Sequence, residues 1–258
     1  MPKLSIITIN FNNDKCLEAT IKSVIQQNYS NYEFIIIDGN STDDSKSVIN
    51  TYKSYLSYWV SEPDNGIYNA MNKGINQAKS DYLLFLNSGD SLIDDTNILE
   101  DIHGLLQDDI VAFDCLLFRD GKQVGKRTHI EKPTLFYVYK YGFKHQSTFI
   151  KRTLFETFGL YNESYNISGD YEFWIRCVLS PETKIRGYNK ILSNFQLGGI
   201  SQRSNWGEEH RVIEQKLLPH LIEDFGHYDK LLAYDRSRVL KPIVKIYSFV
   251  RKQFRKIK

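Results

Sequence analysis

Short apolar segments alternate with amphipathic ones through the first 86 residues, and this alternation constrains the fold more than any other feature. Apolar residues recur at helical spacing in residues 17–25, 48–52 and 67–78. Four segments placed around these helices are typical of buried strands, namely residues 4–9, 34–37, 58–60 and 82–86. Strands and helices that alternate in this way form a mostly parallel sheet with helices on both faces. We therefore expect an α/β fold.

Three of these strands run into polar clusters. The clusters are Asn10-Phe11-Asn12, Asp38-Gly39-Asn40 and Asn87-Ser88-Gly89-Asp90. Each cluster alone is also a plain turn, because all of these polar residue types and Gly favour turns. However, the carboxyl ends of parallel strands meet at one edge of the sheet, where α/β proteins bind their ligands. Three polar exits together predict a binding site at this edge.

The second half of the chain has a different pattern. The segments 110–118 and 123–130 flank Arg119-Asp120-Gly121-Lys122, which predicts a hairpin. Further strands are expected at 145–151 and 191–197, and helices at 169–179 and 208–225. The glycine-containing segment 197–203 follows the last strand. We expect a main domain over residues 1–204, with halves at 1–100 and 101–204, followed by a helical extension at 205–235 and a tail at 236–258.

The overall composition excludes several classes of protein. Three cysteines, Cys16, Cys115 and Cys177, lie far apart without metal-ligand spacing, so neither a disulfide framework nor a zinc site is expected. The first residues, MPKLSIITINFNND, lack the apolar core of a signal peptide, and no apolar run reaches 18 residues. We therefore expect a cytoplasmic protein. The sequence also lacks GxGxxG after its first strand, GxxxxGK[ST] and GxSxG, which argues against dehydrogenases, P-loop enzymes and serine hydrolases.

Six motifs in order give the chain a family resemblance. They read SIITINFNN, IIIDGNSTDD, SEPDNGIYNAMNKGI, FLNSGD, KHQSTFIKR and SGDYEFWIR. In this order they resemble the inverting family 2 glycosyltransferases with the GT-A fold, over about residues 3–201. The third and fourth motifs resemble the branch that builds bacterial surface polysaccharides such as O-antigen. This resemblance implies a donor nucleotide sugar, usually a UDP-sugar, and a divalent metal, Mn²⁺ or Mg²⁺.

The resemblance places the donor nucleoside at the first two strand ends. It implies that Asp38 accepts a hydrogen bond from the uracil N3–H; the alternative is a turn aspartate before Gly39. Thr8 and Asn10 could bind the base or ribose and Phe11 could cover the base, although plain packing at a strand end explains these three nearly as well. Further on, Glu62 and Asp64 of SEPD are expected to line the same pocket.

FLNSGD occupies the position of the family's DxD-type metal motif. Many relatives have acids where this chain has Asn87 and Gly89, so Asp90 is the one strong ligand left. Mg²⁺ and Mn²⁺ prefer oxygen ligands and accept donor phosphates in addition to one or two carboxylates. We expect Asn87 to give a weaker carbonyl ligand, the diphosphate to supply much of the coordination, and Gly89 to let the backbone approach the phosphates.

SGDYEFWIR matches the family's ED motif, whose second acid is the expected catalytic base. Inversion is a single displacement, so one carboxylate must take the proton from the attacking acceptor hydroxyl. Asp170 holds that position, while Gly169 replaces the first acid. Glu172 is the alternative base. A plainly structural role, an acid stabilised at a helix N-terminus, is compatible with either assignment.

Three further residues are candidates. His145 and Gln146 fall where the family has residues on the acceptor or phosphate side, although a lone histidine is often structural. Residues 197–203 form a candidate flap from which Arg203 would reach the diphosphate.

Charge is divided unevenly along the chain. Nine of the 33 Lys and Arg residues fall within residues 236–258, which contain no Asp or Glu, so 24 basic residues face all 31 acidic ones in residues 1–235. An acidic body argues against a general nucleic-acid binder. Apolar residues recur at helical spacing among the tail's cations, at Leu240, Ile243, Val244, Tyr247, Val250 and Phe254. We expect this tail to lie on an anionic membrane surface; the alternative is a helix packed on the body or a frayed end.

These features predict a hexosyltransferase on the inner face of the cell membrane. It would move a hexose from a UDP-sugar to a lipid-pyrophosphate-linked saccharide for an O-antigen-like or lipopolysaccharide polymer. The alternative is a non-catalytic nucleotide-sugar-binding or scaffold protein of the same fold, which only the acids missing at Asn87, Gly89 and Gly169 favour. A nucleotidyltransferase would need a loop rich in glycine and cations after the first strand, and NFNNDKC is not one.

Overall fold

The computed structural model describes residues 4–199, 206–237 and 241. The chain divides into two compact units, Met1–His210 and Arg211–Lys258. The first unit contains the sheet and every site residue discussed below. The second contains the rest of helix α9 (Trp206–Leu217) and helix α10 (Ile222–Arg236).

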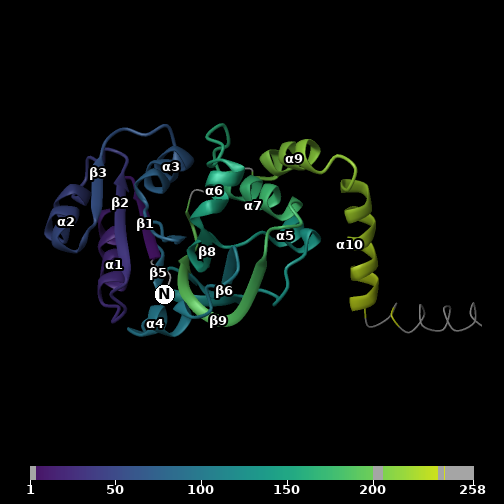
Figure 1. Cartoon of the computed structure of the whole chain (residues 1–258), viewed down its shortest axis with the longest axis horizontal. Helices are drawn as coiled ribbons and strands as arrows, with labels where there is room; N and C mark the ends of the chain where they lie inside the picture. Colours follow the sequence, from purple (N-terminus) through teal and green to yellow (C-terminus); the bar gives the residue numbers. More distant parts are fainter. Residues whose placement is uncertain (1–3, 200–205, 238–240, 242–258) are drawn as a thin grey trace, which may run out of the picture. The chain divides into compact units, whose positions relative to one another are not determined.

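The first half of the sheet is parallel (Figure 1). Its strands are β1 (Leu4–Asn10), β2 (Tyr32–Asp38), β3 (Tyr58–Ser61) and β4 (Tyr82–Phe85), in the spatial order β3-β2-β1-β4. Asn10 lies directly opposite Asp38 in the β1–β2 register. Beyond β4 the chain continues beside β1, because Ser88 N donates to the Ile9 carbonyl at 3.1 Å. The three predicted polar exits therefore share one edge.

The second half of the sheet is mixed. The order continues from β4 to β8 (Thr148–Lys151), β6 (Ile110–Arg119), β9 (Ile185–Gln196) and β5 (Ser91–Leu92), with β7 (Lys122–Arg127) paired to β6. β8 is antiparallel to both of its neighbours. The predicted hairpin of β6 and β7 is confirmed. Its turn has positive φ at Asp120 (49°) and Gly121 (73°), the geometry that two-residue hairpin loops require.

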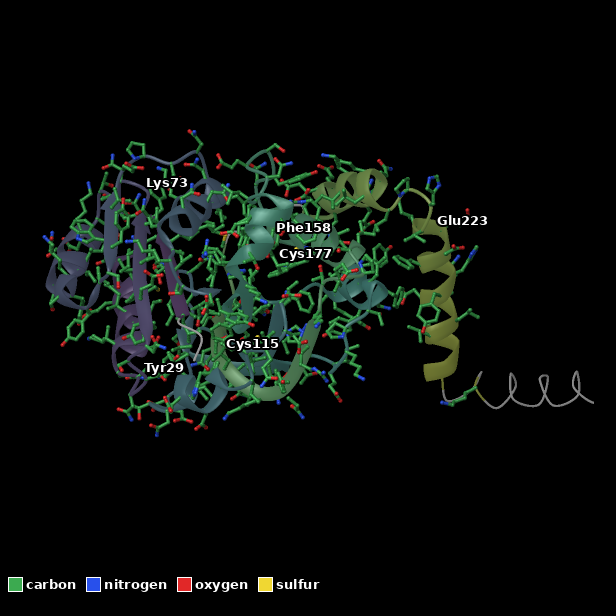
Figure 2. The ribbon with its side chains drawn as sticks, viewed as in Figure 1. Tyr29, Lys73, Cys115, Phe158, Cys177 and Glu223 are labelled. Atoms are coloured by element: carbon green, nitrogen blue, oxygen red, sulfur yellow. The ribbon has the colours of Figure 1, made fainter. Side chains whose placement is uncertain are left out.

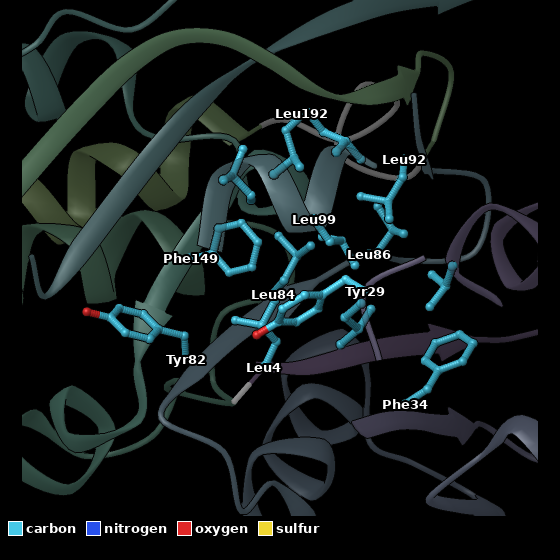
Figure 3. Packing of buried hydrophobic residues seen from close by; sticks show 14 of the residues in the cluster. Leu4, Tyr29, Phe34, Tyr82, Leu84, Leu86, Leu92, Leu99, Phe149 and Leu192 are labelled. Carbon is cyan, nitrogen blue, oxygen red and sulfur yellow. The ribbon is translucent and has the colours of Figure 1, made fainter. Parts of the chain in front are cut away.

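Helices cover both faces of the sheet, as the alternation predicts. One core cluster joins Leu4 and Phe34 to α1 (Asp14–Ile25), α2 (Ser45–Thr51) and α4 (Ile98–His103), and Figure 3 shows part of this cluster. The opposite face carries three helices: α3 (Ile67–Gln77), α6 (Arg152–Phe158) and α7 (Gly169–Leu179). There the ring of Phe155 stacks on Phe173 at 4.4 Å and meets Phe85 edge-on at 6.4 Å.

Helix α3 packs closely against β1 at Gly74. A Cβ atom on Gly74 would lie 2.5 Å from the Ile7 side chain, so only glycine fits there. α3 carries Tyr68 in its first turn, and the close approach fixes this turn at the edge where the strands end.

Some predicted elements differ from the structure in their bounds. The expected helix over 208–225 is two helices, because Pro219 lies between α9 and α10 and cannot donate the backbone hydrogen bond that a continuous helix needs. The expected strand at 145–151 begins with the 3₁₀ turn η2 (His145–Ser147). Five further elements were not predicted: the 3₁₀ turn η1 (Lys53–Tyr55), strand β5, and helices α4, α5 (Leu135–Tyr141) and α6. In the part of the chain that is described, no helix is long and apolar enough to cross a membrane.

Candidate functional site

Asp38 organises the nucleoside end of the site. Its side chain is fully buried, and its two oxygens accept four hydrogen bonds. Oδ1 accepts from Asn10 Nδ2 at 2.8 Å and from the Ser41 hydroxyl at 2.5 Å. Oδ2 accepts from the Ser41 amide at 2.9 Å and from the Ser61 hydroxyl at 2.6 Å. Ser41 thus anchors the carboxylate and does not cap a helix, and uracil would have to displace one of these donors.

Thr8 and Asn10 are likewise bonded within the protein. The Thr8 hydroxyl is buried and donates to the Leu86 carbonyl at 2.7 Å, which holds β1 to β4. Thr8 is thus engaged inside the sheet, and its expected contact with base or ribose stays a prediction. Asn10 is 5% exposed, and its Oδ1 is a buried acceptor without a partner.

Phe11 and Asp64 form the wall of the predicted nucleoside pocket. Phe11 is 64% exposed, so its aromatic ring is accessible to a base bound beside it. A Cβ atom on Gly39 would lie 2.5 Å from an Asp64 oxygen and 3.2 Å from the Phe11 ring. These three residues therefore meet at the end of β2, where a larger residue than Gly39 would displace the Asp64 carboxylate.

Glu62 is directed elsewhere. Its carboxylate pairs with Lys73 of α3 at 2.7 Å, at the outer surface where Figure 2 labels Lys73. Because both side chains lie on the surface, this pair contributes little to stability. Of the two SEPD acids expected in the same pocket, Asp64 lies beside Gly39 and Phe11, whereas Glu62 is paired with Lys73.

The loop from Asn87 to Asp90 lies beside the start of α1. Gly89 has φ 108°, a left-handed conformation that glycine adopts readily, and its amide donates to the Thr20 hydroxyl at 3.1 Å. Thr20 also donates to the Asp90 carbonyl at 2.7 Å. The loop is thus held by α1 in one conformation, with the Asp90 side chain 6% exposed.

His145 lies between the two candidate carboxylates. Its Nε2 is 3.8 Å from Asp90 Oδ2, and its Nδ1 is 3.7 Å from Asp170 Oδ2. These distances are those of ion pairs and are too long for hydrogen bonds. The Asn87 amide nitrogen lies 3.3 Å from the same Nε2. One histidine therefore connects the metal-motif loop to the first turn of α7.

The charges of this cluster shift the ionisation of its members. Burial opposes the charged form of His145, but Asp170 and Asp90 outweigh it and raise the pKa of His145 to about 9. Burial raises the pKa of Asp90, and His145 offsets this only in part. For Asp170, burial is outweighed by His145, by Tyr68 and by the Tyr171 amide, so its pKa lies below the usual value. Asp170 is therefore a carboxylate at neutral pH, able to accept a proton.

The residues of the loop fit a divalent cation that phosphates complete. Asp90 offers a buried carboxylate, and Asn87 Oδ1 is a buried oxygen without a partner. Two oxygens do not make a full coordination sphere, and within the described ranges no three His, Cys, Asp or Glu side chains are grouped to hold a metal. Mg²⁺ is often held by one or two carboxylates together with substrate phosphates, so this donor set fits a metal bound with the donor.

The two candidate bases have different surroundings. Asp170 faces His145, and its Oδ1 accepts from the Tyr68 hydroxyl at 3.0 Å. Glu172 is buried and engaged by Arg176 at 2.9 Å. The structure therefore brings Asp170, and not Glu172, into the cluster with His145.

Tyr68 also explains why glycine precedes Asp170. A Cβ atom on Gly169 would lie 2.8 Å from the Tyr68 ring, so the ring fills the space that a larger side chain at this position would need. Sequence reasoning missed Tyr68, although it lies in the motif SEPDNGIYNAMNKGI, one residue from the predicted apolar stripe of α3.

The remaining candidates are less engaged. Gln146 is fully buried, and neither its amide nitrogen nor its oxygen has a partner. Arg203 and most of the predicted tail lie outside the described residues. Two cations near His145, Arg127 and Lys144, were not predicted; the basic residue next to the histidine in KHQSTFIKR was the available signal.

Known proteins resemble the chain over most of its length. A PGL/p-HBAD biosynthesis glycosyltransferase of Mycobacterium tuberculosis is 28% identical over 228 residues, which are 85% of this chain and 84% of that protein. An uncharacterized glycosyltransferase of the same species is 34% identical over 187 residues, or 70% of this chain and 71% of that protein. A GalNAc(5)-diNAcBac-PP-undecaprenol beta-1,3-glucosyltransferase of Campylobacter jejuni is 36% identical, but over only 36% of this chain and 31% of that protein.

Solved structures and a family model agree with these relatives. TarS 1-349 of S. aureus in complex with UDP-GlcNAc superposes with a TM-score of 0.70 at 18% identity, over 83% of this chain. The chain spans 65% of that structure. At 18% identity, this likeness supports the GT-A fold alone. The mannosyltransferase PcManGT of Pyrobaculum calidifontis, in complex with GDP-Man and Mn²⁺, gives a TM-score of 0.58 at 12% identity, over 96% of this chain and 80% of that one. The model described as Glycosyl transferase family 2 matches residues 5–167, so the chain belongs to glycosyl transferase family 2.

Proposed function

We propose that this glycosyltransferase inverts the anomeric carbon as it moves a hexose from a UDP-sugar to a saccharide carried on a lipid pyrophosphate. The observation that carries the proposal is His145, which lies within 3.8 Å of both Asp90 and Asp170. A donor-side and an acceptor-side carboxylate so close together suit a single displacement between two bound substrates. The named activity of the Campylobacter relative supports a lipid-linked acceptor.

The nucleotide lies, in this proposal, along the ends of β1 and β2. Phe11 covers the uracil, while Asp64 and the glycine gap at Gly39 shape the pocket. Asp38 keeps its four protein donors until the base exchanges for one of them. The UDP-GlcNAc complex of the structural neighbour supports a UDP-sugar donor.

Asp90 and the Asn87 oxygen hold Mn²⁺ or Mg²⁺ together with the donor diphosphate. When bound, this metal neutralises charge on the leaving diphosphate. Asp170 takes the proton of the acceptor hydroxyl, while Tyr68 orients the carboxylate through its 3.0 Å hydrogen bond. His145 keeps a positive charge between the two carboxylates, which favours the ionised form of each.

A surface polymer such as O-antigen fits this chemistry, because its precursors are assembled on membrane lipids. The organisation proposed is a transferase domain over residues 1–204, a helical extension at 205–235 and a basic tail at 236–258 on the inner face of the cell membrane. Each Lys or Arg close to anionic lipid contributes about 1 kcal/mol. Deletion of residues 237–258 should therefore abolish salt-sensitive co-sedimentation with anionic liposomes; equal pelleting of the full-length and truncated proteins would contradict the tail's role.

A panel of UDP-sugars tests the function directly. Each is incubated with a synthetic lipid-pyrophosphate saccharide and Mn²⁺, and the product is read by mass spectrometry. The expected result is a mass increase of one hexose with one donor. Binding of UDP-sugars without transfer to any acceptor would favour the non-catalytic alternative, which the missing acids at Asn87 and Gly89 suggest.

A further inference from the structure

Two cations near the site lack an anionic partner. Arg127 ends β7, and Lys144 directly precedes His145. One Arg127 Nη donates to the Tyr141 carbonyl at 3.0 Å, and the guanidinium lies over the Tyr141 ring at 5.3 Å. Its Nε is buried without a partner. Neither cation forms an ion pair with any residue that the structure describes.

The nearby carboxylates are already engaged. Asp114, beside β7, pairs with Lys126 at 2.8 Å and accepts the His129 amide at 3.0 Å. Asp170 is held by Tyr68 and His145. Burial lowers the pKa of Lys144 and the neighbouring Arg127 lowers it further, so the two positive charges destabilise each other. Partly buried cations without a partner are costly unless an anion neutralises them.

We propose that Arg127 and Lys144 bind the pyrophosphate of the acceptor. This inference rests on the proposed function and names the part of the substrate that the two cations hold. Arginine is suited to phosphates, since its planar group donates two parallel hydrogen bonds. The buried Nε of Arg127 and the ammonium of Lys144 supply donors for which the described residues show no acceptor.

The position of the cations favours the acceptor over the donor diphosphate. The nucleoside end lies at β1 and β2, whereas Arg127 lies opposite Cys115 of β6, beyond β4 and β8. Lys144 is close enough to Asp170 for this carboxylate to raise its pKa. Asp90, on the donor side, faces the opposite nitrogen of His145. The cations therefore continue the site on the side where Asp170 receives the acceptor.

Binding of geranyl pyrophosphate tests the site without any need for transfer. Calorimetry measures its affinity for the full-length protein in the presence of UDP and Mn²⁺, with geraniol as the uncharged comparison. Arg127→Gln and Lys144→Gln should each weaken geranyl pyrophosphate about tenfold or more, since each removes a charge-assisted hydrogen bond. UDP affinity should stay within about twofold. Arg119→Gln, which removes an exposed cation from the same hairpin, should change neither affinity.

The contradicting results are distinct. Unchanged affinity for geranyl pyrophosphate in both variants would overturn the site, and an equal loss of UDP affinity in variants that melt like the wild type would assign the cations to the donor. If one variant fails to fold, the other decides. Absence of transfer by the wild-type protein would refute the proposed function, while the binding result would stand separately.

Discussion

The two ends of the site differ in how their polar groups are satisfied. At the nucleoside end, Asp38 accepts four hydrogen bonds from Asn10, Ser41 and Ser61. At the acceptor end, His145 faces its carboxylates at 3.7 and 3.8 Å, and the side chains of Gln146 and Arg127 contain buried atoms without partners. The Asp38 carboxylate is satisfied by protein groups, although the Asn10 Oδ1 beside it is not, whereas the acceptor end contains donors and charges that a ligand would satisfy.

This difference separates stability from function. A saturated buried carboxylate stabilises the fold, because each partner would otherwise be left buried and unpaired. Charged groups that only a ligand neutralises contribute little to the stability of the fold or lower it, and their role is in binding. Substitutions at the two ends should therefore have opposite profiles.

The largest effect is expected at Asp170. Asp170→Asn removes the proton acceptor, which should lower turnover by about 10²–10⁴-fold. UDP binding should remain nearly unchanged, because this group acts on the acceptor. Turnover and UDP affinity are measured on the same preparation, with Glu172→Gln as the matched control. Near-normal turnover in Asp170→Asn together with an inactive Glu172→Gln would reverse the assignment of the base.

Asp38 should matter for the fold. Asp38→Ala leaves the donors of Asn10, Ser41 and Ser61 without their acceptor, which should lower the free energy of unfolding by about 2–4 kcal/mol. Urea denaturation followed by circular dichroism measures this change. Asp64→Ala, at the pocket wall, is the control that should weaken UDP binding with little loss of stability. Comparable stability of the two variants would break the contrast between a structural and a binding carboxylate.

Substitution of Asp90 should weaken binding more than it lowers stability, the reverse of what is expected for Asp38. Asp90→Ala should weaken UDP-sugar binding about ten- to a hundredfold and remove its dependence on Mn²⁺, since carboxylate, metal and diphosphate form one site. Stability should be little affected, because burial already opposes the charge of Asp90. Calorimetric titrations with and without Mn²⁺ provide the measurement. Metal dependence that survives in Asp90→Ala would exclude this residue as a ligand.

His129 sharpens the comparison through pH. Burial and the charge of Arg127 lower the pKa of His129 to about 4, whereas an unfolded chain binds the proton near pH 6.5. Between these values the unfolded state binds more protons, so stability is full above pH 6.5 and is lost as the pH falls toward 4. The free energy of unfolding should drop by about 2 kcal/mol from pH 7 to pH 5 through this residue. Denaturation at both pH values should show a smaller drop in the free energy of unfolding for His129→Phe. The exposed control His227→Gln should show the same drop as the wild-type protein.

Much of the nucleoside end was predictable, because it depends on local patterns. Consecutive parallel strands are usually neighbours, which brings the strand ends at Asn10 and Asp38 together. The partners of Asp38 were not predictable, since Ser61 arrives from a third strand and serine is a residue type that caps helices as readily as it binds a carboxylate.

The acceptor end depends on contacts between distant segments. Tyr68, His145 and Asp170 come from three elements that only the mixed half of the sheet brings together. The family pattern indicated His145 and Asp170 individually. It did not indicate that one would lie beside the other, or that the Tyr68 ring would occupy the space beside Gly169.

The anomeric configuration of the product tests the central claim most directly. A single displacement between Asp90 and Asp170 turns an α-linked UDP-hexose into a β-linked product, without a covalent sugar–enzyme intermediate. The wild-type protein is incubated with Mn²⁺, the active UDP-sugar and the lipid-pyrophosphate saccharide, and the proton NMR coupling at the new linkage is measured. A β-linkage is the predicted result, and an α-linked product would contradict the account.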